Sequence, residues 1–147
     1  MSAQITFEKT FGGDENDFGF AVGQTTDGGY ILFGQTQSFG NGLQDMYLVK
    51  TDEEGNETWS QTYGGLDYEF GISAQQTLDG GYILCGGYSG IGNDSLALIK
   101  TDSNGNEIWN NRFSGTASRD VGQFVQQTFD GGFIAVGFTG DAPSEDI

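Results

Sequence analysis

The sequence predicts an all-β protein built from repeated units of about fifty residues, and three observations support this prediction. Asp-Gly-Gly recurs at Asp27, Asp79 and Asp130, and an aromatic residue follows it each time. Lys-Thr-Asp recurs at Lys50 and Lys100. Short apolar runs alternate with glycine-rich turn signals, and no stretch shows the periodicity of a helix.

Within the second unit the pattern predicts four strands, over residues 71–77, 82–86, 95–100 and 107–113. Asp79-Gly80-Gly81 separates the first two strands, because glycine tolerates the positive φ that a tight turn requires. Asp102 and Gly105 mark the turn between the last two. The four strands are therefore expected to form an antiparallel sheet that the other units repeat.

The middle strands of each unit are apolar at consecutive positions, which indicates that both of their faces are covered. A lone sheet cannot cover both faces, but a sheet stacked between sister sheets can. Radial stacking of such sheets is the geometry of a β-propeller. We therefore expect propeller blades, with Ile31, Leu84 and Ile134 buried between neighbouring sheets.

The repeat divides the single domain of residues 1–147 into four segments. Residues 4–16 are expected to hold a lone outer strand, residues 17–65 the first blade, residues 66–115 the second, and residues 116–147 a partial third. A closed ring needs at least about four blades, so this arc would expose apolar faces at both ends. Either two copies associate to close a ring of about six blades, or the chain is a fragment of a larger propeller.

Composition narrows the range of partners. The formal net charge is −16, from 21 acidic and 5 basic residues with no histidine. Such a surface repels phosphate backbones and anionic lipids, so nucleic acid is not an expected partner, whereas divalent cations and basic partners remain compatible. The acidity could equally serve solubility alone. No apolar run approaches membrane-spanning length, so membrane insertion is not expected.

The N-terminal residues and the single cysteine give two further expectations. The first residues match no signal peptide. Cys85 is the only cysteine, which excludes an internal disulfide, and its apolar neighbours indicate that it is buried.

The repeated motifs resemble a known family. Asp-Gly-Gly-Tyr-Ile-Leu at 79–84 and Leu-Ile-Lys-Thr-Asp-x-x-Gly-Asn-Glu-x-Trp at 98–109 resemble propeller-type repeats of bacterial and archaeal secreted or surface proteins. The second motif is also similar to the tryptophan-docking repeat of quinoprotein propellers, although their quinone-binding and metal-binding residues have no matching motif here. The resemblance covers residues 4–147 and implies a propeller fold and an extracellular or cell-surface location. It places the docking tryptophan at Trp59 and Trp109, with Phe7 one period earlier.

Several repeated polar residues could be either functional or structural. Acids precede the first strand of each unit and could bind Ca²⁺, the one candidate cofactor, or could instead cap the strands or bond the backbone of a neighbouring blade; they are Asp17, Glu69 and Asp120. Glutamines on those strands could bind a small polar ligand or link adjacent blades; they are Gln24, Gln76 and Gln127. Asp27, Asp79 and Asp130 are interpreted as turn residues.

Aromatic residues suggest a possible carbohydrate site. Trp59 and Trp109 could stack on sugars, but their strict repetition favours packing between blades. Phe39, Tyr68 and Tyr88 are expected to be exposed in variable loops, where they are better sugar-stacking candidates.

Catalysis is not expected. Without histidine there is no Ser-His or Cys-His pair, and near-identical repeats give carboxylates near-identical environments rather than distinct acid and base roles. The leading hypothesis is a non-catalytic propeller scaffold for binding or adhesion that self-assembles into a ring. The alternatives are a carbohydrate-binding lectin and a propeller fragment with no independent activity.

Overall fold

Every regular element in the described part of the chain is a β-strand. The computed structural model describes residues 7–90, 94–115 and 119–140. The first sheet has the order β1-β2-β3-β4, with strands Asp17–Gln24, Tyr30–Thr36, Asp45–Thr51 and Glu57–Tyr63. The second has the order β5-β6-β7-β8, with strands Tyr68–Gln76, Tyr82–Ser89, Ser95–Thr101 and Glu107–Phe113. The third pairs β9 (Arg119–Gln127) with β10 (Phe133–Gly140). All pairings within the sheets are antiparallel, so the predicted all-β class with four-stranded antiparallel sheets is confirmed.

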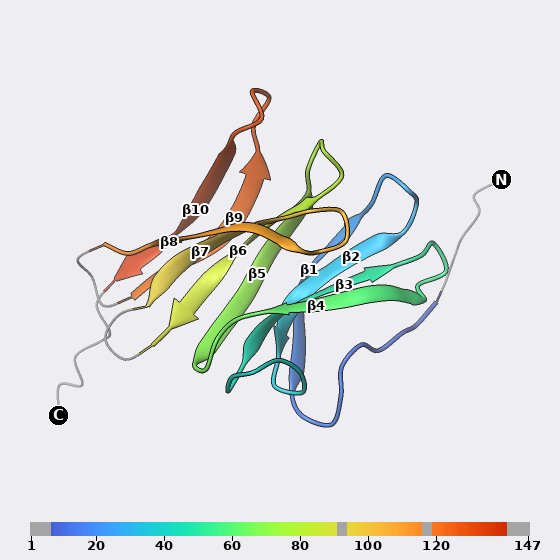
Figure 1. Cartoon of the computed structure of the whole chain (residues 1–147), viewed down its shortest axis with the longest axis horizontal. Helices are drawn as coiled ribbons and strands as arrows, with labels where there is room; N and C mark the ends of the chain where they lie inside the picture. The colour runs from blue at the N-terminus through green and yellow to red at the C-terminus, as the bar shows by residue number, and fades with distance from the viewer. Residues whose placement is uncertain (1–6, 91–93, 116–118, 141–147) are drawn as a thin grey trace.

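The three sheets lie side by side with their faces in contact. The second sheet lies between the other two, and the first and third occupy opposite ends of the stack (Figure 1). Strand β5 contacts β1, β2 and β3, while β9 contacts β5, β6 and β7. The first strand of each sheet therefore lies next to the first strand of its neighbour, and each pair of neighbouring sheets shares a core.

The predicted turns follow from the glycines of the Asp-Gly-Gly motif. The first of these glycines has a positive φ in all three units, for example +83° at Gly80. The second lies against the neighbouring strand: a Cβ on Gly29 would lie 2.1 Å from the carbonyl oxygen of Thr51, and one on Gly81 would lie 2.1 Å from that of Thr101. Any side chain at this second position would separate the turn from the third strand of its sheet.

Burial of the middle strands depends on the place of their sheet in the stack. All residues of β6 except the last are buried, because both faces of the second sheet are covered. In β2, burial alternates along much of the strand, as expected when one face is better covered than the other. One core joins Ile31 and Phe33 of the first sheet to Tyr82 and Leu84 of the second.

The prediction that Ile134 is buried is wrong. Ile31 and Leu84 are buried as predicted, but Ile134 is 62 % exposed. Its equivalent in β6, Ile83, lies on the face that packs against the third sheet. The same face of β10 has no described sheet beyond it. The same face exposes Phe124 and Val136.

The outer strand predicted within residues 4–16 is not present in residues 7–16, and residues 4–6 lie outside the described residues. A strand needs a hydrogen-bonding neighbour, and among the described residues no third strand of a preceding sheet is available to pair with this segment. Strands β5 and β6 are also longer than predicted, since β5 begins at Tyr68 and β6 continues to Ser89. Cys85 is buried as predicted.

The three equivalent isoleucines provide a test of the stacking. Ile31 and Ile83 are 1 % and 0 % exposed, whereas Ile134 is 62 % exposed. Ile31→Ala and Ile83→Ala should each lower the free energy of unfolding by about 2–5 kcal/mol, because each leaves a cavity in a core. Ile134→Ala should change it by less than about 1 kcal/mol. Urea unfolding of dilute protein measures all three, and equal losses would show that the sheets are not arranged as described.

Candidate functional site

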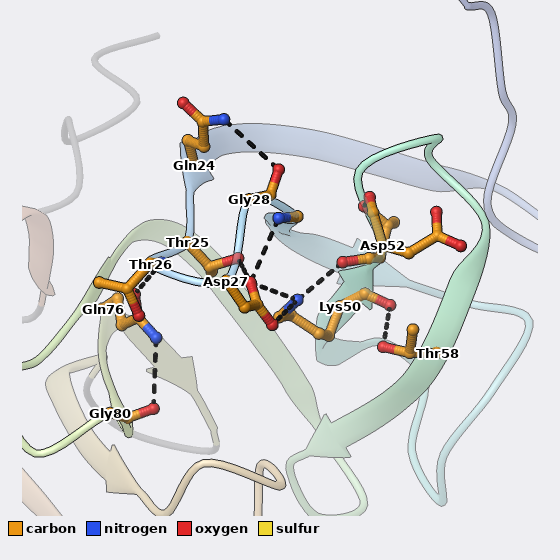
Figure 2. Close-up of polar contacts among 12 residues, drawn as sticks. Gln24, Thr25, Thr26, Asp27, Gly28, Lys50, Asp52, Thr58, Gln76 and Gly80 are labelled. Atoms are coloured by element: carbon orange, nitrogen blue, oxygen red, sulfur yellow. Dashed lines mark hydrogen bonds and ion pairs between the residues drawn. The ribbon is translucent and has the colours of Figure 1, made fainter.

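The turn of the first sheet carries a polar network centred on Asp27 and Lys50 (Figure 2). Lys50 Nζ lies 2.9 Å from Asp27 Oδ2 and donates to the carbonyl oxygen of Thr51 at 2.7 Å. Thr25 Oγ1 and the backbone N–H of Gly29 donate to Asp27 Oδ1 at 2.5 and 3.2 Å. The lysine side chain is only 7 % exposed, so the ion pair neutralises a buried ammonium group while the carboxylate remains partly in water.

The second sheet repeats this network. Lys100 Nζ lies 3.0 Å from Asp79 Oδ2, and Thr77 and Gly81 donate to Asp79 as their counterparts donate to Asp27. Hydrogen bonds from the threonine and then from the lysine lower the pKa of each aspartate to about 2. Asp130 keeps the bonds from Thr128 and Gly132, but it has no lysine partner among the described residues. The interpretation of these aspartates as turn residues agrees with their hydrogen bonds.

The two tryptophans pack across the junctions between neighbouring sheets, and Phe7 makes a similar contact with the first sheet. Trp59 meets Tyr82 and Trp109 meets Phe133, each with ring centroids 5.8 Å apart in an edge-to-face arrangement. The third pair has the same geometry: the ring of Phe7 lies 5.9 Å from that of Tyr30. The two tryptophan contacts therefore join neighbouring sheets, and both indoles remain half-buried.

Two of the three repeated glutamines form hydrogen bonds with the preceding sheet. Gln76 Oε1 accepts from the backbone N–H of Thr26 at 2.9 Å, and Gln127 Oε1 accepts from that of Leu78 at 2.8 Å. The amide nitrogens of Gln24, Gln76 and Gln127 each donate to a glycine carbonyl in their own turn, at 3.4 Å. The structural alternative therefore accounts for Gln76 and Gln127, whereas Gln24 has the same conformation at the end of the stack.

A groove of about 650 Å³ opens between the turns of the first and second sheets. We call it the junction groove; its lining includes Asp27, Asp52, Glu53, Trp59, Gln76 and Tyr82. Carboxylates and amides surround the half-buried indole, so the groove offers hydrogen bonds and one aromatic surface. Lys50 also lines the groove, but its ammonium group is bound to the carboxylate of Asp27 and to the carbonyl oxygen of Thr51. This lysine is therefore not available in the groove as a free cation or nucleophile.

Each acid proposed for Ca²⁺ accepts a hydrogen bond from a glycine four or five residues earlier in the chain. Asp17 accepts from Gly13 N–H and Ser38 Oγ, both at 2.8 Å, Glu69 accepts from Gly65 N–H at 3.1 Å, and Asp120 accepts from Gly115 N–H at 2.5 Å. Burial raises the pKa of Glu69, while a hydrogen bond from Thr139 lowers that of Asp120. For Asp17 the opposing effect of burial is outweighed by hydrogen bonds, and its pKa is lowered.

These three acids do not converge. Within residues 7–90, 94–115 and 119–140, no group of three or more acidic, histidine or cysteine side chains is arranged to hold a metal ion. The bonds described above are those expected of strand caps, which was the alternative to Ca²⁺.

The candidate sugar-stacking aromatics differ in exposure. Phe39 and Tyr68 are exposed, although Phe39 packs obliquely on Tyr47 with centroids 5.4 Å apart and Tyr68 begins β5 rather than lying in a loop. The prediction that Tyr88 is exposed is wrong. It is buried in β6, the guanidinium of Arg112 covers its ring at 3.4 Å, and its hydroxyl accepts from Asn110.

Sequence reasoning missed a second link between the first two sheets. Gln44 forms a parallel bridge with Tyr68, and its buried amide donates to the carbonyl oxygen of Glu69 at 3.2 Å. The contact of Arg112 with Tyr88 was also missed. Neither contact is seen in another unit among the described residues, and neither involves the repeated motifs, so the periodicity that revealed the turns gave no signal for them.

Neither the protein-family models nor the curated proteins compared with this chain gave a match. No helix in the described ranges is long and apolar enough to cross a membrane.

The ion pair predicts a specific dependence of stability on pH. The pKa of Asp79 is lowered from 3.8 to about 2, so its contribution is present above pH 4 and is lost as the pH falls from about 4 to 2. Asp79→Asn should lower the free energy of unfolding at pH 7 by about 1–2 kcal/mol, a modest loss because the carboxylate is partly exposed. It should also flatten the dependence between pH 4 and pH 2.

Asp130→Asn is the matched control, since Asp130 has the same threonine and glycine bonds without a described lysine partner. Chemical unfolding of both variants across this pH range provides the measurement. Equal losses at pH 7 would show that Lys100 does not stabilise the turn.

Proposed function

We propose that this protein is a non-catalytic scaffold of the β-propeller type, which closes by stacking on a second copy of itself and presents its sheet junctions for binding. The observation that supports the proposal most directly is the pair of end faces. Ile134 and Val136 on β10 are each 62 % exposed, although their equivalents in the middle sheet, Ile83 and Cys85, are buried. At the other end, Val22 on β1 is 71 % exposed. Exposed apolar patches of this kind mark interaction surfaces.

The chemistry of the junctions supports a binding role more than a catalytic one. The chain contains no histidine, and the aspartates, lysines and glutamines described above are hydrogen-bonded within or between the turns. A general base or nucleophile requires a group free to reach a substrate. The resemblance of the repeats adds the proposal that the scaffold acts outside the cell or at its surface.

Carbohydrate binding is a second candidate, and the junction groove is the observation that favours it. The half-buried indole of Trp59 lies among carboxylates and amides, which are suited to hydrogen-bonding sugar hydroxyls. If the protein is a lectin, a glycan array should show selective binding, and Asn104→Trp, which would fill the groove from its rim, should abolish it. Absence of binding across the array would remove the lectin candidate and leave the scaffold.

Self-association is tested by molar mass in solution. Light scattering at micromolar concentration should give a multiple of the 15.7 kDa chain. Val22→Lys should reduce the mass to that of one chain, since it places a charge on an exposed end face, while the free energy of unfolding of dilute protein changes by less than about 0.5 kcal/mol. Leu78→Lys is the control, because Leu78 is also largely exposed but lies in a turn away from both end faces. A monomeric wild type would contradict the proposal and leave the chain as a propeller fragment.

A further inference from the structure

The two internal junctions use one hydrogen-bond register. In each, the glutamine at the end of the first strand of one sheet accepts from the backbone N–H in the turn of the preceding sheet, as Gln76 does from Thr26 and Gln127 from Leu78. The glutamine side chain is held by its second bond, to Gly80 or Gly131. The register is therefore a repeated feature of the stack.

Both halves of a third such bond lie at the ends of the stack. Gln24 Nε2 already donates to Gly28, which holds its amide as in the other units, and no described group donates to its Oε1. At the other end, Phe129 is equivalent to Thr26 and Leu78, and its backbone N–H has no acceptor among the described residues. The chain thus presents an acceptor at one end and the matching donor at the other.

The apolar side chains at the two ends also match the internal junctions. Between the first two sheets, Ala21, Ile31 and Phe33 pack on Ala74, Tyr82 and Leu84. In the third sheet, the residues equivalent to Ala21, Ile31 and Phe33 are Phe124, Ile134 and Val136, and all three are more than half exposed. In the first sheet, the residues equivalent to Ala74, Tyr82 and Leu84 are Val22, Tyr30 and Leu32, and none of these is buried.

The open areas of the two ends complement each other. Phe7 already packs on Tyr30, in the position that an outer-strand tryptophan takes in the other junctions, and Phe11 lines the same side of the first sheet. The part left open lies over β1 and β2, where Val22 is 71 % exposed. The described part of the third sheet, strands β9 and β10, corresponds to β1 and β2, which cover the equivalent area of the second sheet.

We propose that the third sheet of one copy docks on the first sheet of another in the internal register, with Gln24 Oε1 accepting from the backbone N–H of Phe129 in the partner copy. This inference rests on the self-association proposed above and specifies its geometry. The interface is head-to-tail, since different faces meet, and such an interface either closes into a ring or continues as an open array.

Cysteine crosslinking tests the register. Gln24→Cys combined with Phe129→Cys should yield covalent oligomers with a short bismaleimide, because the two positions of different copies would lie as close as Thr26 and Gln76 do within one chain. Thr26→Cys combined with Gln76→Cys is the matched control and should crosslink within single chains. Wild type, with only the buried Cys85, should not react while folded.

The remaining outcomes are distinguishable. If light scattering shows oligomers and the control pair crosslinks, but the 24–129 pair does not, the register is overturned while self-association stands. If the wild type is monomeric, both fail. In the supporting case, Gln24→Ala should raise the dissociation constant roughly 5- to 10-fold, the usual effect of one lost hydrogen bond, without changing the unfolding of dilute monomer.

Discussion

Face-to-face contact between sheets is the interaction on which the structure depends. A four-stranded antiparallel sheet with apolar residues on both faces gains stability from each face that a neighbouring sheet covers, and among the described sheets the second has both faces covered. Ile83 is buried there, whereas its equivalent Ile134 is exposed. The same side chain thus has a different environment in different units, because coverage depends on the neighbouring sheet rather than on the local sequence.

Polar contacts fix how the sheets align. Apolar packing tolerates small sliding movements, but a hydrogen bond from the Thr26 backbone to Gln76 requires one relative position. The ion pair between Lys50 and Asp27 connects the turn to the third strand of the same sheet, so the turn presents its backbone N–H in a fixed direction. The regular spacing of these motifs along this chain therefore places the turns and glutamines that align the sheets.

The same repetition explains why the end faces suggest a partner. A chain whose units pack on one another carries, at its two ends, the complementary halves of its own interface. Association through these faces would extend an interaction that already occurs twice in the molecule, which distinguishes it from an unrelated apolar patch. Binding of another ligand would then take place in the grooves between turns, where Trp59 and its polar neighbours remain accessible.

The sequence by itself determined the repeat, the strand class, the turn positions and the docking aromatics, because each depends on local backbone geometry or on a motif that recurs at a fixed period. It predicted the observed bounds of β8, and it predicted that Phe7 takes the position of the tryptophans one period earlier. Only the tertiary structure decided which faces are covered, that Tyr88 lies beneath Arg112, and that Gln44 links two sheets. The contacts of Gln44 and Arg112 join residues far apart in the chain and lie outside the repeated motifs, so no periodic signal accompanies them.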